Sequence, residues 1–146
     1  MSGEFLGTFY NSVNKQKWIT IPAGIKKKFA PSAKQQVIVT IGPQSNIAIY
    51  PLDNWNKKIE KLSNGNEREK KLLIMLRTFA SAQQKMEANG RVKIQDELLV
   101  LAQIDGKVVI KGEGNFISVW NPERYRTYTQ ELMKEHTKSF DTLDYQ

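Results

Sequence analysis

The stretch Met86-Glu-Ala-Asn-Gly-Arg-Val-Lys-Ile94 opens the part of the chain that decides the fold. Its Asn-Gly pair is a strong hairpin signal, and a short strand, a helical segment at 96–102 and two further strands are expected to follow. Residues 13–55 contain the same parts in the same order. Two copies are too few for a solenoid, so the repeat predicts one domain built about an internal pseudo-two-fold axis.

The two copies align position by position, with apolar residues at the same places. Ile21 and Ile94 end equivalent strands, so we expect both side chains to be buried to the same extent. The other equivalent pairs are Val13 and Met86, Ile25 and Leu98, Val37 and Val108, Tyr50 and Trp120, and Trp55 and Tyr125.

The start of the second copy resembles the MraZ family, which belongs to the AbrB-like, swapped-hairpin group of DNA-binding proteins. Glu87, Gly90 and Arg91, followed by a strand, match its motif of an acid, a glycine and an arginine. The resemblance covers roughly residues 4–128. It implies an α+β fold in which two AbrB-like swapped-hairpin strand-helix-strand-strand repeats form a pseudo-two-fold barrel with outer helices.

The first copy departs from that motif at three positions. Asn14 stands in place of the acid, Lys17 in place of the glycine and Trp18 in place of the arginine. The resemblance therefore implies DNA binding by the second copy, and the altered first motif leaves open whether the first copy also binds DNA.

Polar and breaking residues divide the chain into four segments. Ser63-Asn-Gly-Asn66 is the clearest internal break, and Asn66 is a suitable cap for a helix that runs to about Phe79. The predicted parts are a first repeat at 4–62, a connecting helix at 63–80, a second repeat with a C-terminal helix at 81–134, and a flexible tail at 135–146.

The charge distribution favours an anionic partner. The net charge is +7; residues 1–80 contain 13 Lys and Arg against 5 Asp and Glu, whereas residues 81–146 contain 9 against 10. A basic half of this kind is typical of association with nucleic acid, although a basic bias also occurs in soluble proteins without such a partner.

Arg91 is the first candidate for a DNA contact. One interpretation is structural, with Glu87 and Arg91 paired across the turn to fix the hairpin. In the other, Glu87 holds Arg91 extended, so that the planar guanidinium reaches a phosphate or a guanine edge. Lys85 and Lys93 lie nearby in the sequence, while Asn14 and Gly90 support the two turns.

In the first copy, Lys15 and Lys17 could attract phosphate without the bidentate geometry of arginine. Trp18 could stack on a base, since it stands where a loop meets a strand. The lysines at 26–28 are spread around a helix, so most of them are expected to be solvated.

Catalytic, metal and membrane functions receive no support. His136 is the only histidine and cysteine is absent, so neither a nucleophilic triad nor a zinc site is expected, and no cofactor or small-molecule substrate is predicted. The absence of cysteine is compatible with a reducing cytoplasm. No apolar run reaches the ~18–20 residues that span a bilayer.

The resemblance implies a transcriptional regulator that controls the cell-division and cell-wall gene cluster by binding repeats of double-stranded DNA upstream of its own operon. It also implies a ring-shaped homo-oligomer in the cytoplasm, associated with the nucleoid. Two alternatives remain: a ring-forming scaffold with weak or no sequence-specific DNA binding, and an antitoxin-like AbrB relative. The latter typically carries one copy and a disordered tail.

Overall fold

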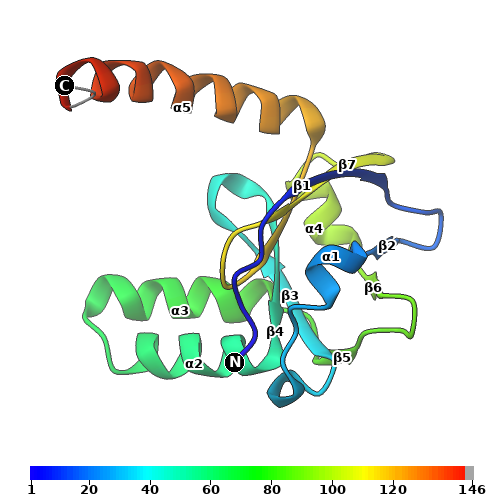
Figure 1. Cartoon of the computed structure of the whole chain (residues 1–146). Coiled ribbons are helices and arrows are strands. Elements are labelled where there is room, and N and C mark those ends of the chain that lie inside the picture. Colours follow the sequence, from blue (N-terminus) through cyan, green and yellow to red (C-terminus); the bar gives the residue numbers. More distant parts are fainter. Residues whose placement is uncertain (144–146) are drawn as a thin grey trace.

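The computed structural model describes residues 1–143, with side chains as far as residue 138, and it has the predicted α+β class. A six-stranded antiparallel sheet has the strand order β1-β7-β8-β4-β3-β5, and a separate two-stranded ribbon is formed by β2 and β6 (Figure 1). The strands are β1 (Thr8–Ser12), β2 (Trp18–Thr20), β3 (Gln36–Ile41), β4 (Ile47–Pro51), β5 (Gln84–Lys85), β6 (Arg91–Lys93), β7 (Lys107–Gly112) and β8 (Ile117–Trp120).

The first strand of each copy pairs with the sheet of the other copy. β1 lies against β7 with Ser12 opposite Lys107, and β5 lies against β3 with Lys85 opposite Gln36. These two pairings occupy equivalent positions of the repeat and have the same register. The copies are therefore interlocked, since neither provides its own partner for its first strand.

The β2–β6 ribbon lies on the pseudo-two-fold axis. Ile19 pairs with Val92, and these residues are equivalent in the repeat, so the axis passes between them. The N–H of Ile21 donates to the carbonyl of Gly90 at 2.9 Å, and the N–H of Ile94 donates to that of Lys17 at 2.8 Å. This reciprocal pair of bonds joins the end of each strand to the turn of the other copy.

The predicted closed barrel is not found. In the part of the chain that the structure describes, β1 and β5 are the outer strands of the six-stranded sheet and do not pair with each other. The ribbon covers the sheet instead of completing it, because β2 and β6 are only three residues long and pair with each other alone.

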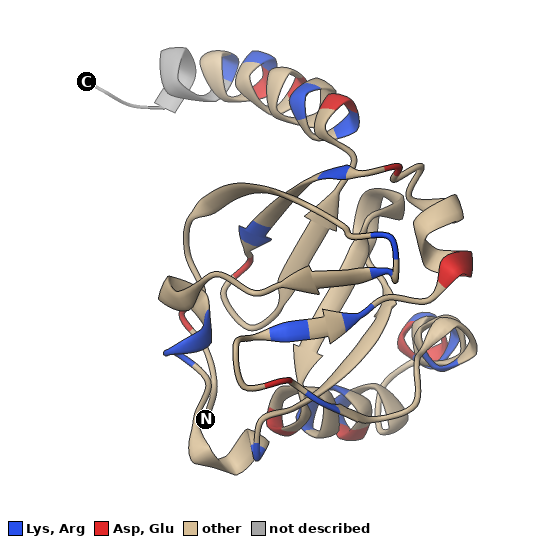
Figure 2. Cartoon of the chain, turned by 90° about the vertical axis from the view of Figure 1, so that its right-hand side faces the viewer, with Lys and Arg blue, Asp and Glu red and all other residues tan. Residues whose placement is uncertain are grey.

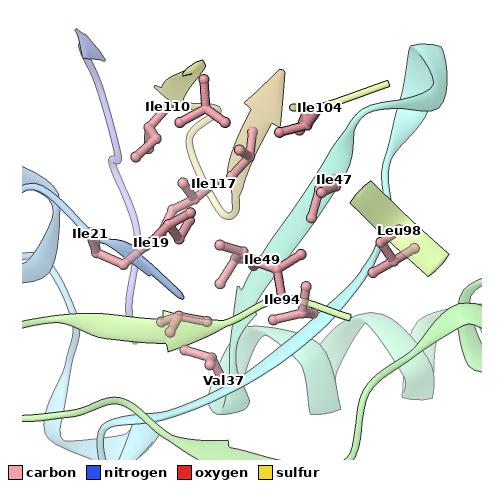
Figure 3. Close-up of a cluster of buried hydrophobic side chains, with 14 of the residues drawn as sticks. Ile19, Ile21, Val37, Ile47, Ile49, Ile94, Leu98, Ile104, Ile110 and Ile117 are labelled. Atoms are coloured by element: carbon pink, nitrogen blue, oxygen red, sulfur yellow. The ribbon is translucent and has the colours of Figure 1, made fainter. Parts of the chain in front are cut away.

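The core lies between the ribbon and the sheet (Figure 3). Ile21 and Ile94 are each 1% exposed, which confirms the predicted equivalence of their strands. Trp120 is buried and stacks on Tyr128, while Trp55 packs against the smaller cluster formed by the helices. Both tryptophans therefore contribute to packing.

The outer helices differ between the two copies. After the first copy, α2 (Leu52–Ser63) and α3 (Glu67–Phe79) form an antiparallel hairpin beside the sheet (Figure 1), and α3 begins with a capping box of Asn66 and Glu69. After the second copy, α5 (Pro122–Leu143) extends away from the body. The shorter helices are α1 (Ala23–Lys26), α4 (Asp96–Leu101), and the 3-10 turns η1 (Pro31–Ala33) and η2 (Pro43–Ser45).

The C-terminal helix is longer than the sequence suggested. It was expected to end near residue 134, before a flexible tail, but α5 continues to Leu143. Residues 144–146 of that predicted tail lie outside the described residues. None of the described helices is both long enough and apolar enough to cross a bilayer.

Candidate nucleic-acid interface

Two equivalent turns precede the strands of the ribbon. In the first, the N–H of Lys17 donates to the carbonyl of Asn14 at 3.0 Å; in the second, the N–H of Gly90 donates to the carbonyl of Glu87 at 2.8 Å. The next residue, Trp18 or Arg91, accepts from the first turn residue at 3.0 Å in both copies. The first copy therefore keeps the backbone of the motif although its side chains have changed.

Lys17 adopts the conformation for which the second copy uses glycine. Its φ is +70° and that of Gly90 is +88°, both in the left-handed region. Gly90 is also confined by its surroundings, because a Cβ at this position would lie 3.0 Å from the carbonyl oxygen of Ile21. The left-handed conformation of Lys17 therefore costs conformational free energy, and the second turn avoids this cost by using glycine.

Asn14 stabilises the first turn through its side chain. Its Oδ1 accepts from the N–H of Gln16 at 3.0 Å and from the N–H of Trp18 at 2.9 Å. Asparagine favours such local turns, and a carboxylate could accept the same bonds. The replacement of the acid by Asn14 thus preserves the turn while removing a negative charge from the surface.

Four side chains share the outer face of the ribbon. Trp18 lies opposite Lys93 and Thr20 lies opposite Arg91, whereas Ile19 and Val92 point to the core. Thr20 and Lys93 are exposed, and Trp18 and Arg91 are half-buried. The short strands therefore present two cations and an indole ring to solvent.

Arg91 is placed by Trp18 and does not pair with Glu87. The guanidinium carbon lies 4.9 Å from the centre of the indole ring, a cation–π distance, and Nε is buried without a hydrogen-bond partner. Within the described residues no ion pair joins Glu87 to Arg91, and Glu87 is exposed. The predicted side-chain pair is therefore wrong; cross-strand stacking replaces it because Trp18 and Arg91 share one face.

The other predicted cations surround the ribbon. The ammonium of Lys93 lies 5.6 Å from the centre of the Trp18 ring and donates to the carbonyl of Gln16 in the first turn. Lys15 and Lys17 are exposed in that turn. Basic segments lie on the ribbon and on the turn that leads into β2 (Figure 2). Lys85 is also exposed, but it belongs to β5, on the sheet side of the second turn.

Two contacts at this interface were not anticipated from the sequence. One is the stacking of Arg91 on Trp18, and the other is the bond that the ammonium of Lys26 donates to the carbonyl of Ala88 in the second turn. The repeat alignment contained a signal for the first. Positions 18 and 91 are equivalent and lie next to the axis, so antiparallel pairing must bring them onto one face.

The arrangement is suited to binding a polyanion. An exposed, positively charged ribbon attracts phosphates, and an arginine fixed by stacking keeps its donors in a defined plane. Among the described residues, no group of three or more His, Cys, Asp or Glu side chains could hold a metal ion.

Known proteins resemble the chain over most of its length. The family model with the description "MraZ protein" and the qualifier "antitoxin-like" matches residues 79–144. A protein of Christiangramia forsetii named "Transcriptional regulator MraZ" is 24% identical over 82% of this chain and 79% of its own length.

Two further relatives bear the same name. That of Thiobacillus denitrificans is 27% identical over 93% of this chain and 98% of its own length. The relative from Pediococcus pentosaceus is 26% identical over 95% of this chain and 93% of its own length. The family match covers the better-preserved second copy, and these alignments extend through both copies. The chain is therefore similar to proteins of the MraZ family through both of its copies.

Proposed function

We propose that the protein is a DNA-binding transcriptional regulator of MraZ type, which binds repeats upstream of its operon and controls the cell-division and cell-wall gene cluster. The names of its relatives support regulation of transcription. The single structural observation that carries DNA binding is the exposed cationic ribbon, in which Arg91 lies on the face of Trp18. Such a regulator acts in the cytoplasm, on the nucleoid.

Arg91 is the residue that we expect to read sequence. Its side chain has the bidentate donors that recognise O6 and N7 of guanine, and its orientation is limited by the indole beneath it. Lys15, Lys17, Lys85 and Lys93 are expected to contact phosphates, which position the protein without identifying bases. In this interpretation Trp18 supports Arg91 and does not replace it as a reader.

We further propose that the protein acts as a ring-shaped homo-oligomer. The edge strands β1 and β5 are unpaired on one side in the described chain. On α3, Ile74 is 66% exposed and Met75 is 50% exposed, and Met133 on α5 is 64% exposed. Exposed edges and apolar patches favour association with further copies, and a closed ring would multiply weak DNA contacts.

The second candidate function is a ring-forming scaffold with weak or no sequence-specific DNA binding. The observation that favours it is the first turn, which retains its backbone but carries Trp18 where the motif has arginine. Only one of the two repeats therefore carries the arginine that is expected to recognise a base. The two functions differ in what Arg91 contributes, so a substitution at this position separates them.

The test is a binding titration of Arg91→Ala on the DNA upstream of the protein's own gene, at several salt concentrations, beside a melting curve. We expect a loss of about 1–3 kcal/mol at one base position and a salt slope lower by about one unit. Lys17→Ala is the matched control and should weaken all sequences alike.

Trp18→Ala extends this test to the support of Arg91. It should reduce base discrimination while leaving the salt slope of the wild type nearly unchanged, because the charge is kept and only its orientation is lost. If Arg91→Ala lowered the melting temperature but left DNA affinity intact, the scaffold function would be favoured instead.

A further inference from the structure

Two clefts near the two turns occupy related positions of the repeat but differ in charge. The first cleft, of about 470 Å³, lies between the first turn and α4. The second, here the lysine cleft, has a volume of about 580 Å³ and lies between the α1–η1 segment and Met86. Both volumes fall within the usual range of ligand sites.

The repeat relates part of the lining of these two clefts. Met86 donates its N–H to the carbonyl of Gln35 at 2.7 Å, and Val13 donates to the carbonyl of Gly106 at 2.6 Å. This correspondence fixes the alignment on both sides. The equivalent lining residues are Lys26 and Leu99, Lys27 and Val100, and Lys34 and Asp105.

The lysine cleft contains a concentration of unneutralised positive charge. It is lined by Lys26, Lys27, Lys34 and Lys85 and by no carboxylate, whereas the first cleft is lined by two lysines and by Asp96 and Asp105. None of these four lysines forms an ion pair within the described chain. Like charges repel, so a bound anion would reduce the electrostatic repulsion among these four lysines. The first cleft has less of this repulsion, because it contains two carboxylates.

The lysine cleft also lies next to the turn that precedes Arg91, the residue that we propose recognises a base. Lys26 lines it and donates to the carbonyl of Ala88 in the turn that precedes Arg91, and Lys85 lies on the strand that leads into that turn. Phe29 and Met86 provide apolar wall on the remaining side. A phosphate held here would lie next to the second turn and not next to the first.

We propose that the lysine cleft is a phosphate-binding site. Its ligand is either the DNA backbone flanking the bases read by Arg91 or a free phosphorylated molecule of nucleotide size. The DNA alternative rests on the proposed function, and the cleft's position beside the second turn favours it. If DNA occupies the lysine cleft, each subunit binds DNA asymmetrically. It then makes more phosphate contacts on the side of the second turn than on the side of the first.

The test removes two exposed lysines of the cleft together, as Lys27→Gln with Lys34→Gln. The salt slope of DNA binding should fall by up to about 2 units, at about 0.9 per phosphate contact, and backbone protection should be lost on one flank only. Lys57→Gln with Lys61→Gln on α2 removes the same charge from another helix and is the matched control. The reverse change, Asp105→Lys, should add protection on the opposite flank.

A second arm titrates inorganic pyrophosphate into the full chain by calorimetry without DNA. Binding that the lysine-cleft variant loses and the control retains assigns the cleft to a free phosphorylated ligand. A variant with unchanged salt slope, footprint and pyrophosphate binding overturns the proposal. If the wild type binds DNA through Arg91 in that case, the proposed function survives; if the wild type does not bind DNA, the proposed function fails separately.

Discussion

The turn at residues 14–17 and the turn at residues 87–90 have the same backbone hydrogen bonds, but only the second carries glycine followed by arginine. In the first, a lysine adopts the left-handed conformation and a tryptophan occupies the position of the arginine. Because the strands are antiparallel about the axis, the two different residues meet, and the tryptophan supports the arginine. The two copies thus contribute complementary parts to one surface.

The comparison separates what preserves the fold from what forms the surface. Several core positions have kept their type in both copies, as with Ile21 and Ile94, while exposed positions such as Lys27 and Val100 have diverged. Core packing penalises small changes of volume, whereas exposed residues away from special contacts have small effects on stability. A duplicated fold can therefore keep its pseudo-symmetry while its two faces acquire different tasks.

The largest effect is expected in the core, where the copies should respond equally. Ile21→Ala and Ile94→Ala should each reduce the free energy of unfolding by about 2–5 kcal/mol, because each removes a fully buried side chain and leaves a cavity. Urea denaturation of the two variants measures this. A cost confined to one of them would show that the two strands are not energetically equivalent.

The turns should respond in opposite directions. Gly90→Ala should cost about 1–2 kcal/mol, because φ is +88° and the new Cβ would lie 3.0 Å from a carbonyl oxygen. Lys17→Gly should stabilise the protein by about 0.5–1 kcal/mol, because it relieves a left-handed lysine at some cost in chain entropy. Thermal melts of both variants provide the comparison, and a loss of stability in Lys17→Gly would contradict it.

A smaller, pH-dependent effect is expected where the helices begin. Asn121 caps α5 through its side chain, whereas Pro51 at the equivalent position of α2 makes no side-chain cap bond. Asp53 accepts bonds from the N–H and hydroxyl of Ser2 and from the hydroxyl of Ser32. Partial burial acts to raise the pKa of Asp53, but these bonds outweigh it, and the pKa lies below its ordinary 3.8.

Because the pKa of Asp53 is lower in the folded than in the unfolded protein, its ionisation increases the free energy of unfolding at pH values above the ordinary pKa. This contribution is lost as the pH falls through the pKa of Asp53 in the folded protein. Asp53→Asn should therefore lower stability slightly at pH 7 and flatten its decline below about pH 4. Urea titrations at several pH values measure the slope. Ser32→Ala should produce part of the same change, and an unaltered slope in both variants would exclude this role for Asp53.

The repeat carried most of the information on the fold. Alternating apolar residues and the Asn-Gly signal located the strands of the second copy, and Asn66 was recognised as a helix cap that the structure confirms. Closure into a barrel could not be established in this way, because it depends on whether β1 and β5 meet. Nor did the local pattern indicate that α5 continues past residue 134, since propensity is a weak guide to where a helix ends.

The side-chain geometry of the interface was less accessible from the sequence. Glu87 and Arg91 are four residues apart across a turn, which favoured an ion pair, but Trp18, on which Arg91 stacks, lies far from it in the sequence. Contacts of this kind depend on register, which the hydrophobic pattern fixes only once the pairing strands are known. The proposed DNA contacts of the lysines stay predictions.

The exchange of first strands also bears on how the chain is made. A ribosome releases the N-terminal half first, yet β1 needs residues 107–112 and β2 needs residues 91–93 as partners. Until those residues emerge, the first copy exposes Ile19 and two unsatisfied strand edges, which are features prone to aggregation during synthesis. Biosynthesis of this small protein must therefore postpone its cooperative folding until nearly the whole chain has been translated.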